Sequence, residues 1–151
     1  FSPEHGLQLF LQGQWQCSYR HFSLLAPCSW SIFAWAELQL GKKNPADVRS
    51  AIAANLAKKK QSQPIAERTA GCVFKNPVQD SAGRLLDAAG VKAMRSGAFY
   101  FSAMHANFLV HDASDKTPGD FEDAMRLIQG AEERVRRLFG IELEREVMIW
   151  R

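Results

Sequence analysis

Residues 117–150 read TPGDFEDAMRLIQGAEERVRRLFGIELEREVMIW, and this stretch decides the fold because its apolar pattern changes period at Gly140. Before the glycine, apolar residues recur every three or four positions, which predicts a helix with Thr117 and Pro118 at its start. The side chains expected to face inward are Phe121, Met125, Ile128, Val135 and Leu138. After the glycine, strict alternation over residues 141–150 predicts a strand. Its apolar face holds Ile141, Leu143, Val147 and Ile149, and its other face holds Glu142, Glu144 and Glu146.

A second helix is predicted upstream, beginning after Asn44. Asn44 is a favourable N-cap, and Pro45 suits the first helical position. Apolar residues follow at four-residue spacing at Val48, Ile52 and Leu56. The lysines at 58–60 would occupy the last turn, where positive charge complements the helix dipole. We therefore interpret this basic run as a solvated helix end.

The remaining elements complete an α+β pattern. A short helix is expected over residues 81–89, with Ser81 as its cap and Gly90 after its end. The expected strands are residues 7–11, 30–40, 98–102 and 107–111, with a loop containing Pro27 between the first two and an extended loop or irregular strand over 61–76. This order predicts a small sheet with helices packed on one face.

Composition limits the classes of function. The chain has 151 residues, 46% hydrophobic and 23% charged, as in an ordinary globular protein with room for one domain. The net charge of +3 is not gathered into a stripe and there is no aromatic RNP-type motif, so we expect no nucleic-acid partner. No apolar run reaches the length of a membrane span. The chain begins at Phe1, so we expect a processed protein or a piece of a longer one.

Signatures of common cofactor and metal sites are missing from the sequence. It contains no GxGxxG, no GxxxxGK[ST] and no HExxH motif, and its four histidines are scattered. The three cysteines, Cys17, Cys28 and Cys72, are odd in number and lack CxxC spacing. We therefore expect no metal site and no disulfide framework, and we expect a reducing cytoplasm as the compartment.

The segment AGCVFKNP, residues 70–77, gathers chemical groups in one loop bounded by glycine and proline. Cys72 could serve as a nucleophile, as an acid, or only as a small buried residue. Lys75 and Asn76 could bind a ligand or simply form a turn before Pro77. Glu146 could act chemically or be one of three solvated carboxylates on a strand. The residues alone leave these alternatives open.

Taken together, several motifs resemble a known family. They are Gln63-Pro64, AGCVFKNP (70–77), SAGRLLDAAG (81–90), HANFLV (105–110) and FGIELEREV (139–147). In this order they resemble the C-terminal substrate domain of UDP-N-acetylenolpyruvoylglucosamine reductase, a flavoenzyme family of bacterial peptidoglycan precursor synthesis. The compact HANF form is similar to the family's shorter sequence type. Tyr19-Arg20 resembles the segment through which the family's flavin domain leads into the substrate domain.

The resemblance implies an organisation and a reaction. Residues 1–40 would be the tail end of an FAD-binding domain with its connecting strand, and residues 41–151 would be the substrate-binding domain. The family reduces UDP-N-acetylglucosamine-enolpyruvate to UDP-N-acetylmuramate in the bacterial cytoplasm, with NADPH as reductant. FAD would be bound mainly by an upstream FAD-binding domain, so the 151 residues alone are expected to be inactive.

The resemblance also implies roles for individual residues. Cys72 occupies the position of the family's proton-donating serine, and Glu146 matches a second catalytic group that supports the intermediate. Tyr19 and Asn76 match substrate-binding positions, while Lys75 would anchor a carboxylate or diphosphate on charge grounds. A thiol, with an ordinary pKa of about 8.5, is a stronger acid than an alcohol, so the exchange of serine for cysteine is chemically tolerable.

The match has two local departures and leaves one alternative. Phe22 stands where the family has a serine, and His111 stands where it usually has an asparagine. Both put local contacts in doubt rather than the family. The alternative is a non-catalytic module of the same ancestry that binds a nucleotide sugar or a protein.

Overall fold

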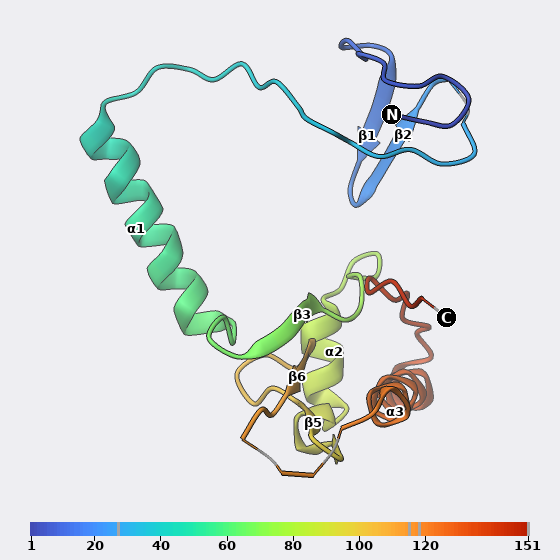
Figure 1. Cartoon of the computed structure of the whole chain (residues 1–151). Helices are drawn as coiled ribbons and strands as arrows, with labels where there is room; N and C mark the ends of the chain where they lie inside the picture. The colour runs from blue at the N-terminus through green and yellow to red at the C-terminus, as the bar shows by residue number, and fades with distance from the viewer. Residues whose placement is uncertain (27, 115, 118, 151) are drawn as a thin grey trace. The chain divides into compact units, whose positions relative to one another are not determined.

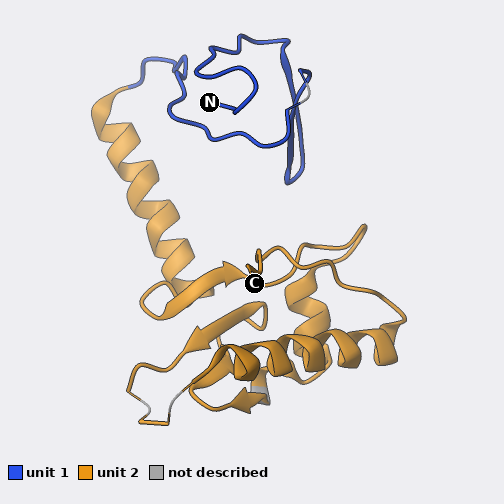
Figure 2. Cartoon of the chain, turned by 45° about the vertical axis from the view of Figure 1, so that its right-hand side comes forward, with its two compact units in different colours: residues 1–43 blue, residues 44–151 orange. Residues whose placement is uncertain are grey.

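The computed structural model describes residues 1–26, 28–114, 116, 117 and 119–150. The chain divides into two compact units, residues 1–43 and 44–151 (Figure 2). Over the described ranges, helices are interspersed with short strands that pair into two antiparallel sheets (Figure 1). This confirms the predicted α+β class. The expected loop at Pro27 lies outside the described residues.

The first unit contains one hairpin, in which β1 (Trp15–Ser18) pairs with β2 (His21–Leu24) in antiparallel register. The strands predicted over residues 7–11 and 30–40 do not form. An extended segment becomes a strand only when a neighbour pairs with its backbone, and alternation of side chains does not provide that neighbour.

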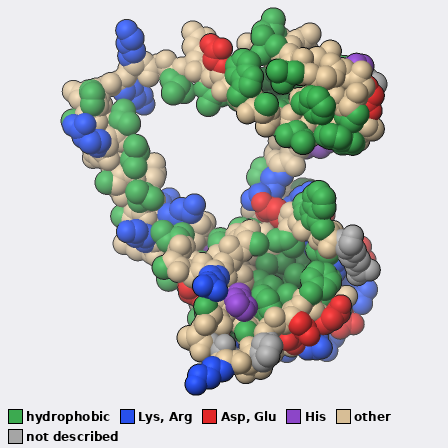
Figure 3. Space-filling model, viewed as in Figure 1, with side chains coloured by type: hydrophobic (Ala, Val, Ile, Leu, Met, Phe, Trp, Pro, Cys, Tyr) green, Lys and Arg blue, Asp and Glu red, His purple; other side chains and the backbone are tan. Residues whose placement is uncertain are grey.

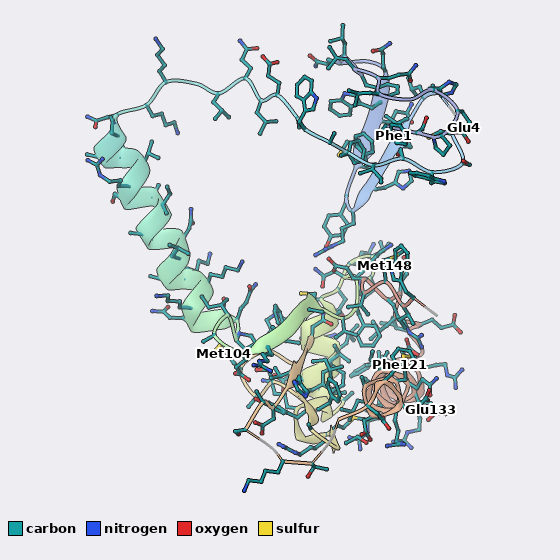
Figure 4. The ribbon with its side chains drawn as sticks, viewed as in Figure 1. Phe1, Glu4, Met104, Phe121, Glu133 and Met148 are labelled. Atoms are coloured by element: carbon teal, nitrogen blue, oxygen red, sulfur yellow. The ribbon has the colours of Figure 1, made fainter. Side chains whose placement is uncertain are left out.

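A few hydrogen bonds join the first residues of this unit to residues 29–32. The Phe1 amino group donates to the Ile32 carbonyl at 3.0 Å, and the Ser29 N–H donates to Glu4 Oε1 at 3.0 Å. Phe1 and Glu4 are labelled in Figure 4. Large apolar side chains nevertheless stay exposed, among them Leu9 and Trp35 at 64% and 60%. They line an open hollow of about 750 Å³, so this unit has little closed core of its own.

Helix α1 (Pro45–Ser62) begins as the sequence predicts, since Asn44 Oδ1 accepts a hydrogen bond from the Ala46 N–H at 2.9 Å. None of its eighteen residues, all of them described, is buried. The stripe of Val48, Ile52 and Leu56 is exposed. The Asn44 cap and the N1 proline are therefore sufficient signals for the helix. The apolar stripe of Val48, Ile52 and Leu56 alone does not determine which part of the protein, if any, covers that face.

The second unit is built on a four-stranded antiparallel sheet in the order β3-β6-β5-β4. Figure 1 labels β3, β6 and β5 of this sheet. Its strands are β3 (Arg68–Cys72), β4 (Arg95–Ser96), β5 (Phe99–Phe101) and β6 (Phe108–His111). The strands predicted at 98–102 and 107–111 are confirmed as β5 and β6. Strand β3 gives regular structure to part of the expected irregular segment 61–76.

Two helices cover the core of this unit. Helix α2 (Ala82–Ala88) is capped by Ser81, whose hydroxyl accepts from the Arg84 N–H at 3.4 Å. Gly90, at a φ of 70°, leads into the short 3-10 helix η1 (Val91–Ala93). The buried cluster joins α2, α3 and the sheet; its largest fully buried members are Phe74, Phe101, Leu85, Leu86, Val91 and Val135.

Helix α3 (Phe121–Phe139) begins three residues later than the sequence pattern suggested. Its N-cap is Asp120, whose carboxylate accepts from the Asp123 N–H at 2.8 Å, and the Asp123 side chain accepts from the Asp120 N–H in return. Gly140, at a φ of 67°, ends the helix as predicted. Phe121 and Leu138 are half exposed rather than inward, because they lie in the terminal turns (Figure 4 labels Phe121).

Residues 141–150 do not form the predicted strand, although their side chains alternate as expected. The apolar ones pack against the core: Ile141, Leu143, Val147 and Ile149. Met148 lies between two of them and is 83% exposed (labelled in Figure 4). Only one isolated bridge, between Phe74 and Arg145, joins this segment to its neighbour. The pairing is too short for a strand, but burial of one face still fixes the orientation of the segment.

Candidate functional site

The AGCVFKNP segment lies between two neighbours in the second unit. Strand β3 ends at Cys72, where it is opposite Phe108 of β6. Beyond that point the Val73 N–H still donates to the Asn107 carbonyl at 2.9 Å. On its other edge the Lys75 N–H donates to the Glu144 carbonyl at 2.8 Å. The segment is therefore held on both edges, as a central strand would be.

Cys72 and Glu146 belong to segments that this pairing brings side by side. The Val73 carbonyl, one residue after Cys72, accepts from the Glu146 N–H at 2.8 Å and from the Val147 N–H at 3.4 Å. Cys72 is half-buried and free of any disulfide. Glu146 is also half-buried, and its Oε2 atom is shielded from solvent. A thiol and a carboxyl group from residues 74 positions apart thus lie on adjacent backbones.

An ion pair anchors the residue before Glu146. The Arg145 guanidinium donates to both carboxylate oxygens of Glu132 on α3, one of these bonds being 2.7 Å. This bidentate pairing raises the pKa of Arg145 above its ordinary value. The pairing ties residue 145 to α3, and we infer that it restricts the backbone that carries Glu146.

Lys75 and Asn76 already have partners within the chain. The Lys75 ammonium pairs with the Glu144 carboxylate at the surface. Asn76 Oδ1 accepts from the Ala82 N–H at 3.0 Å, at the first turn of α2. The positive charge of Lys75 is therefore partly compensated by Glu144 before any ligand binds. Asn76 links the motif to the start of a helix.

Tyr19 belongs to the first unit. It lies in the turn between β1 and β2, is 67% exposed, and its hydroxyl accepts from Arg20 Nε at 3.2 Å. Arg20, the second of the two residues between the strands, adopts a positive φ of 56°. The structure thus groups Cys72, Lys75, Asn76 and Glu146 in the second unit, with Tyr19 in the other.

An apolar hollow of about 450 Å³ borders the same motif. Gly71 and Val73 contribute to it from the motif, Leu109 from β6, Ile128 from α3 and Val147 from the C-terminal segment. Hydrophobic side chains are visible in a recess of this unit in Figure 3. The motif therefore has an apolar surface beside it as well as the polar groups named above.

Asn107 of the HANF motif is a site residue to which the sequence analysis gave no role. It is 2% exposed, and its side chain bonds the backbone of Phe74. The sequence feature that could have indicated this role is a polar residue between Ala106 and Phe108, within an apolar run. Its partner lies 33 positions away, so no local pattern could identify the contact.

His105 of the same motif is an internal acceptor. Its Nδ1 atom accepts from the Asn107 N–H at 3.2 Å, and its ring lies 4.9 Å from the ring of Phe108. A Cβ atom added at Gly83 would come within 2.8 Å of the His105 ring, so α2 needs glycine at this approach. Burial lowers the pKa of His105.

This lowered pKa predicts an acid-sensitive fold. Histidine in an unfolded chain has a pKa of about 6.5. In the folded chain, buried His105 is protonated less readily. The contribution of His105 to the unfolding free energy is therefore complete above that pH and is lost as the pH falls below it. We expect His105→Asn, which keeps a side-chain acceptor but cannot titrate, to flatten the loss of stability between pH 7 and pH 5.

Urea unfolding at several pH values measures this effect. The same substitution at exposed His21 is the matched control and should leave the slope unchanged. An unaltered slope in His105→Asn would contradict the assignment.

Within the described ranges, no group of three or more His, Cys, Asp or Glu residues could hold a metal ion. Cys17, Cys28 and Cys72 form no disulfide. None of the helices in the described part of the chain is both long enough and apolar enough to cross a bilayer.

Comparison with known proteins identifies relatives of this arrangement. Residues 63–150 match the model of the family described as UDP-N-acetylenolpyruvoylglucosamine reductase, C-terminal domain. The chain is 44% identical over 151 residues to the UDP-N-acetylenolpyruvoylglucosamine reductase of Oleidesulfovibrio alaskensis, covering 99% of the chain and 49% of that protein. It is 40% identical over 150 residues to the protein of the same name from Nitratidesulfovibrio vulgaris, covering 99% and 49%.

A solved structure agrees with these matches. The crystal structure of UDP-N-acetylenolpyruvylglucosamine reductase from Thermus caldophilus superimposes with a TM-score of 0.53 at 34% identity, covering 72% of this chain and 37% of that one. The chain spans about half the length of the curated relatives it matches. By its matched motifs, its fold and these relatives, the chain belongs to the UDP-N-acetylenolpyruvoylglucosamine reductase family, whose C-terminal domain it contains.

Proposed function

We propose that the chain is the substrate-binding part of an NADPH-dependent flavoenzyme of the bacterial cytoplasm. This enzyme reduces the enolpyruvyl group of UDP-N-acetylglucosamine-enolpyruvate to give UDP-N-acetylmuramate, a peptidoglycan precursor. Family membership supports the substrate class. The single observation that carries the proposal is the hydrogen bond between the Val73 carbonyl and the Glu146 N–H, because it joins the two candidate catalytic segments.

Cys72 supplies the proton in this proposal. Conjugate addition of a hydride to the terminal carbon of the enolpyruvyl double bond leaves negative charge on the carbon beside the substrate carboxylate. The Cys72 S–H then breaks and its proton forms the new C–H bond at that carbon. The thiolate that remains recovers a proton from water before the next turnover. Cys72 thus acts as a general acid and not as a covalent nucleophile.

Glu146 supports the charged intermediate. Stabilising developing negative charge requires a donor already directed toward it. A carboxyl group can donate a hydrogen bond only when it is protonated. The Oε2 atom of Glu146 is shielded from solvent, and the neighbouring residue Arg145 is held by Glu132. Both features are consistent with a Glu146 carboxyl group kept in one position.

Lys75, Asn76 and Tyr19 are proposed to bind the substrate. The side chains of Lys75 and Glu144 are both accessible to solvent. Lys75 could therefore exchange Glu144 for a substrate carboxylate or diphosphate. Asn76 Oδ1 is held at the start of α2 by the Ala82 N–H, and the amide group of an asparagine can donate hydrogen bonds to ligand oxygens. Tyr19 would contribute from the first unit.

The flavin is assigned to another segment of the protein. In the described ranges we identify no Gly-rich phosphate-binding loop, and therefore no residue of this chain is assigned to FAD. FAD, reduced by NADPH, would supply the hydride. We propose that residues 1–40 are the tail end of the FAD-binding domain and its connecting strand, and that residues 41–151 form the substrate domain. The division into compact units after Lys43 and the exposed apolar side chains of the first unit support this.

Purified residues 1–151 are accordingly expected to be colourless and unable to oxidise NADPH, because the flavin-binding segment is not included. They are expected to bind UDP-N-acetylglucosamine-enolpyruvate weakly in an equilibrium titration. Absorbance spectra and NADPH oxidation assays check the first two expectations. A yellow preparation that carries flavin would contradict the assignment of FAD to another segment.

A further inference from the structure

The Asn107 side chain takes the place of a strand partner. Its Oδ1 atom accepts from the Phe74 N–H at 2.9 Å, and its Nδ2 atom donates to the Phe74 carbonyl at 2.8 Å. Strand β6 begins only at Phe108, so it cannot pair with Phe74 through its own backbone. One amide therefore completes both hydrogen bonds that a neighbouring strand would make.

The amide is required because the contact is buried. Asn107 is 2% exposed and Phe74 1% exposed. A buried backbone N–H or C=O without a partner loses its hydrogen bonds to water without replacement, and water cannot readily replace the lost partner here. Without the amide, the segment that follows Cys72 would have to shift in order to satisfy these groups.

Asn107 contacts two neighbouring residues of the segment that follows Cys72. Its side-chain amide holds Phe74, which bridges to Arg145 beside Glu146. Its backbone carbonyl accepts from the Val73 N–H at 2.9 Å, while the Val73 carbonyl accepts from the Glu146 N–H at 2.8 Å. Val73 is also bonded covalently to Cys72. Asn107 thus holds Val73 through its backbone carbonyl and Phe74 through its side-chain amide, and both residues pair with the segment that carries Glu146.

We infer that Asn107 is a positioning residue that fixes Cys72 relative to Glu146. The inference rests on the proposed function of these two groups. It extends that function by assigning the placement of the proton donor to a buried amide that does not itself touch the substrate. A displacement of about 1 Å at a reacting group can lower turnover about 10²-fold, so loss of this amide should lower kcat far more than it weakens substrate binding.

The working variant is Asn107→Asp, which keeps the size and the Oδ1 acceptor but replaces the Nδ2 donor by a second oxygen facing the Phe74 carbonyl. Asn107→Ala, which removes both bonds, is the second variant. Ser102→Ala is the matched control, because Ser102 is equally buried in the same β5–β6 connection and its hydroxyl accepts from the Met104 N–H, outside the AGCVFKNP segment. Kinetics are measured on the full-length flavoenzyme that contains this chain.

We expect at least one folded Asn107 variant to show a fall in kcat of about 10²-fold, with KM changed less than about threefold. Ser102→Ala should retain its kcat. A readout independent of turnover is the rate of Cys72 alkylation against pH, followed by mass spectrometry in a Cys17→Ser, Cys28→Ser background. The profile of Cys72 should change in the Asn107 variants and not in Ser102→Ala.

A purely structural role for Asn107 would lower the melting temperature but leave kcat and the Cys72 profile as in the wild type. That result would overturn the inference. Failure of the wild-type enzyme to reduce the enolpyruvyl substrate would instead refute the proposed function, and the alkylation profiles would still decide whether Asn107 positions Cys72. Loss of folding in both variants, with Ser102→Ala folded, would count against a specific positioning role.

Discussion

Replacing Cys72 by alanine in the full-length flavoenzyme is expected to lower the turnover of UDP-N-acetylglucosamine-enolpyruvate by about 10²–10⁴-fold, the usual contribution of a general acid. Alanine has no proton to give to the carbon beside the substrate carboxylate. Reduction of the flavin by NADPH does not use this proton and should proceed at its normal rate. Steady-state and single-turnover kinetics separate these two steps.

Cys72→Ser separates the proton donor from a covalent nucleophile. A hydroxyl can donate a proton in the same position, so this variant should keep much of the activity. Cys28→Ser is the matched control, since Cys28 is also half-buried but lies in the first unit. Equal losses in Cys72→Ala and Cys72→Ser would count against the role of Cys72 as an acid.

Phe74→Ala is expected to have the largest effect on stability. Phe74 is 1% exposed within the core cluster, and its backbone bridges to Arg145. Truncating a buried phenylalanine costs about 3–5 kcal/mol through lost burial and the cavity left behind. Since a domain of this size has only about 5–15 kcal/mol of stability, the second unit should be near the limit of folding.

Urea unfolding of the 151-residue chain measures this cost. Val78→Ala is the control, because Val78 follows the same motif but is 91% exposed. It should change the unfolding free energy by less than about 0.5 kcal/mol. A change in Phe74→Ala as small as that in Val78→Ala would show that the motif is not packed in the core as described.

The helices were the most predictable part of the fold. Asn44 and Ser81 cap their helices through bonds to backbone groups two or three residues away, and Gly140 ends α3 in the left-handed region. These signals involve neighbouring residues only, so they can be recognised in a single sequence. The start of α3 was placed too early because Asp120, which makes a capping box with Asp123, outcompetes Thr117.

Strands were less predictable because each needs a partner. Residues 7–11, 30–40 and 141–150 all alternate, yet none forms a strand in the described structure. Alternation predicted which side chains of the last segment pack inward, but it did not indicate how many backbone bonds the segment would make.

The site was only partly predictable for the same reason. Family motifs drew attention to Cys72 and Glu146, whereas their adjacency depends on pairing between residues 73 and 146. The role of Asn107 depends on a side-chain contact across 33 positions, and no period or spacing in the sequence encodes it.

A single-turnover reaction tests the central proposal most directly. The full-length protein, with its flavin reduced by NADPH in the absence of oxygen, is mixed with UDP-N-acetylglucosamine-enolpyruvate. We predict that the flavin is reoxidised as one equivalent of UDP-N-acetylmuramate forms, detected by mass spectrometry. In heavy water the carbon beside the product carboxylate should carry deuterium from the proton donor, in addition to any deuterium that the reduced flavin, after exchange with solvent, delivers to the methyl carbon. A flavin that stays reduced with the enolpyruvyl compound unchanged would contradict the proposal.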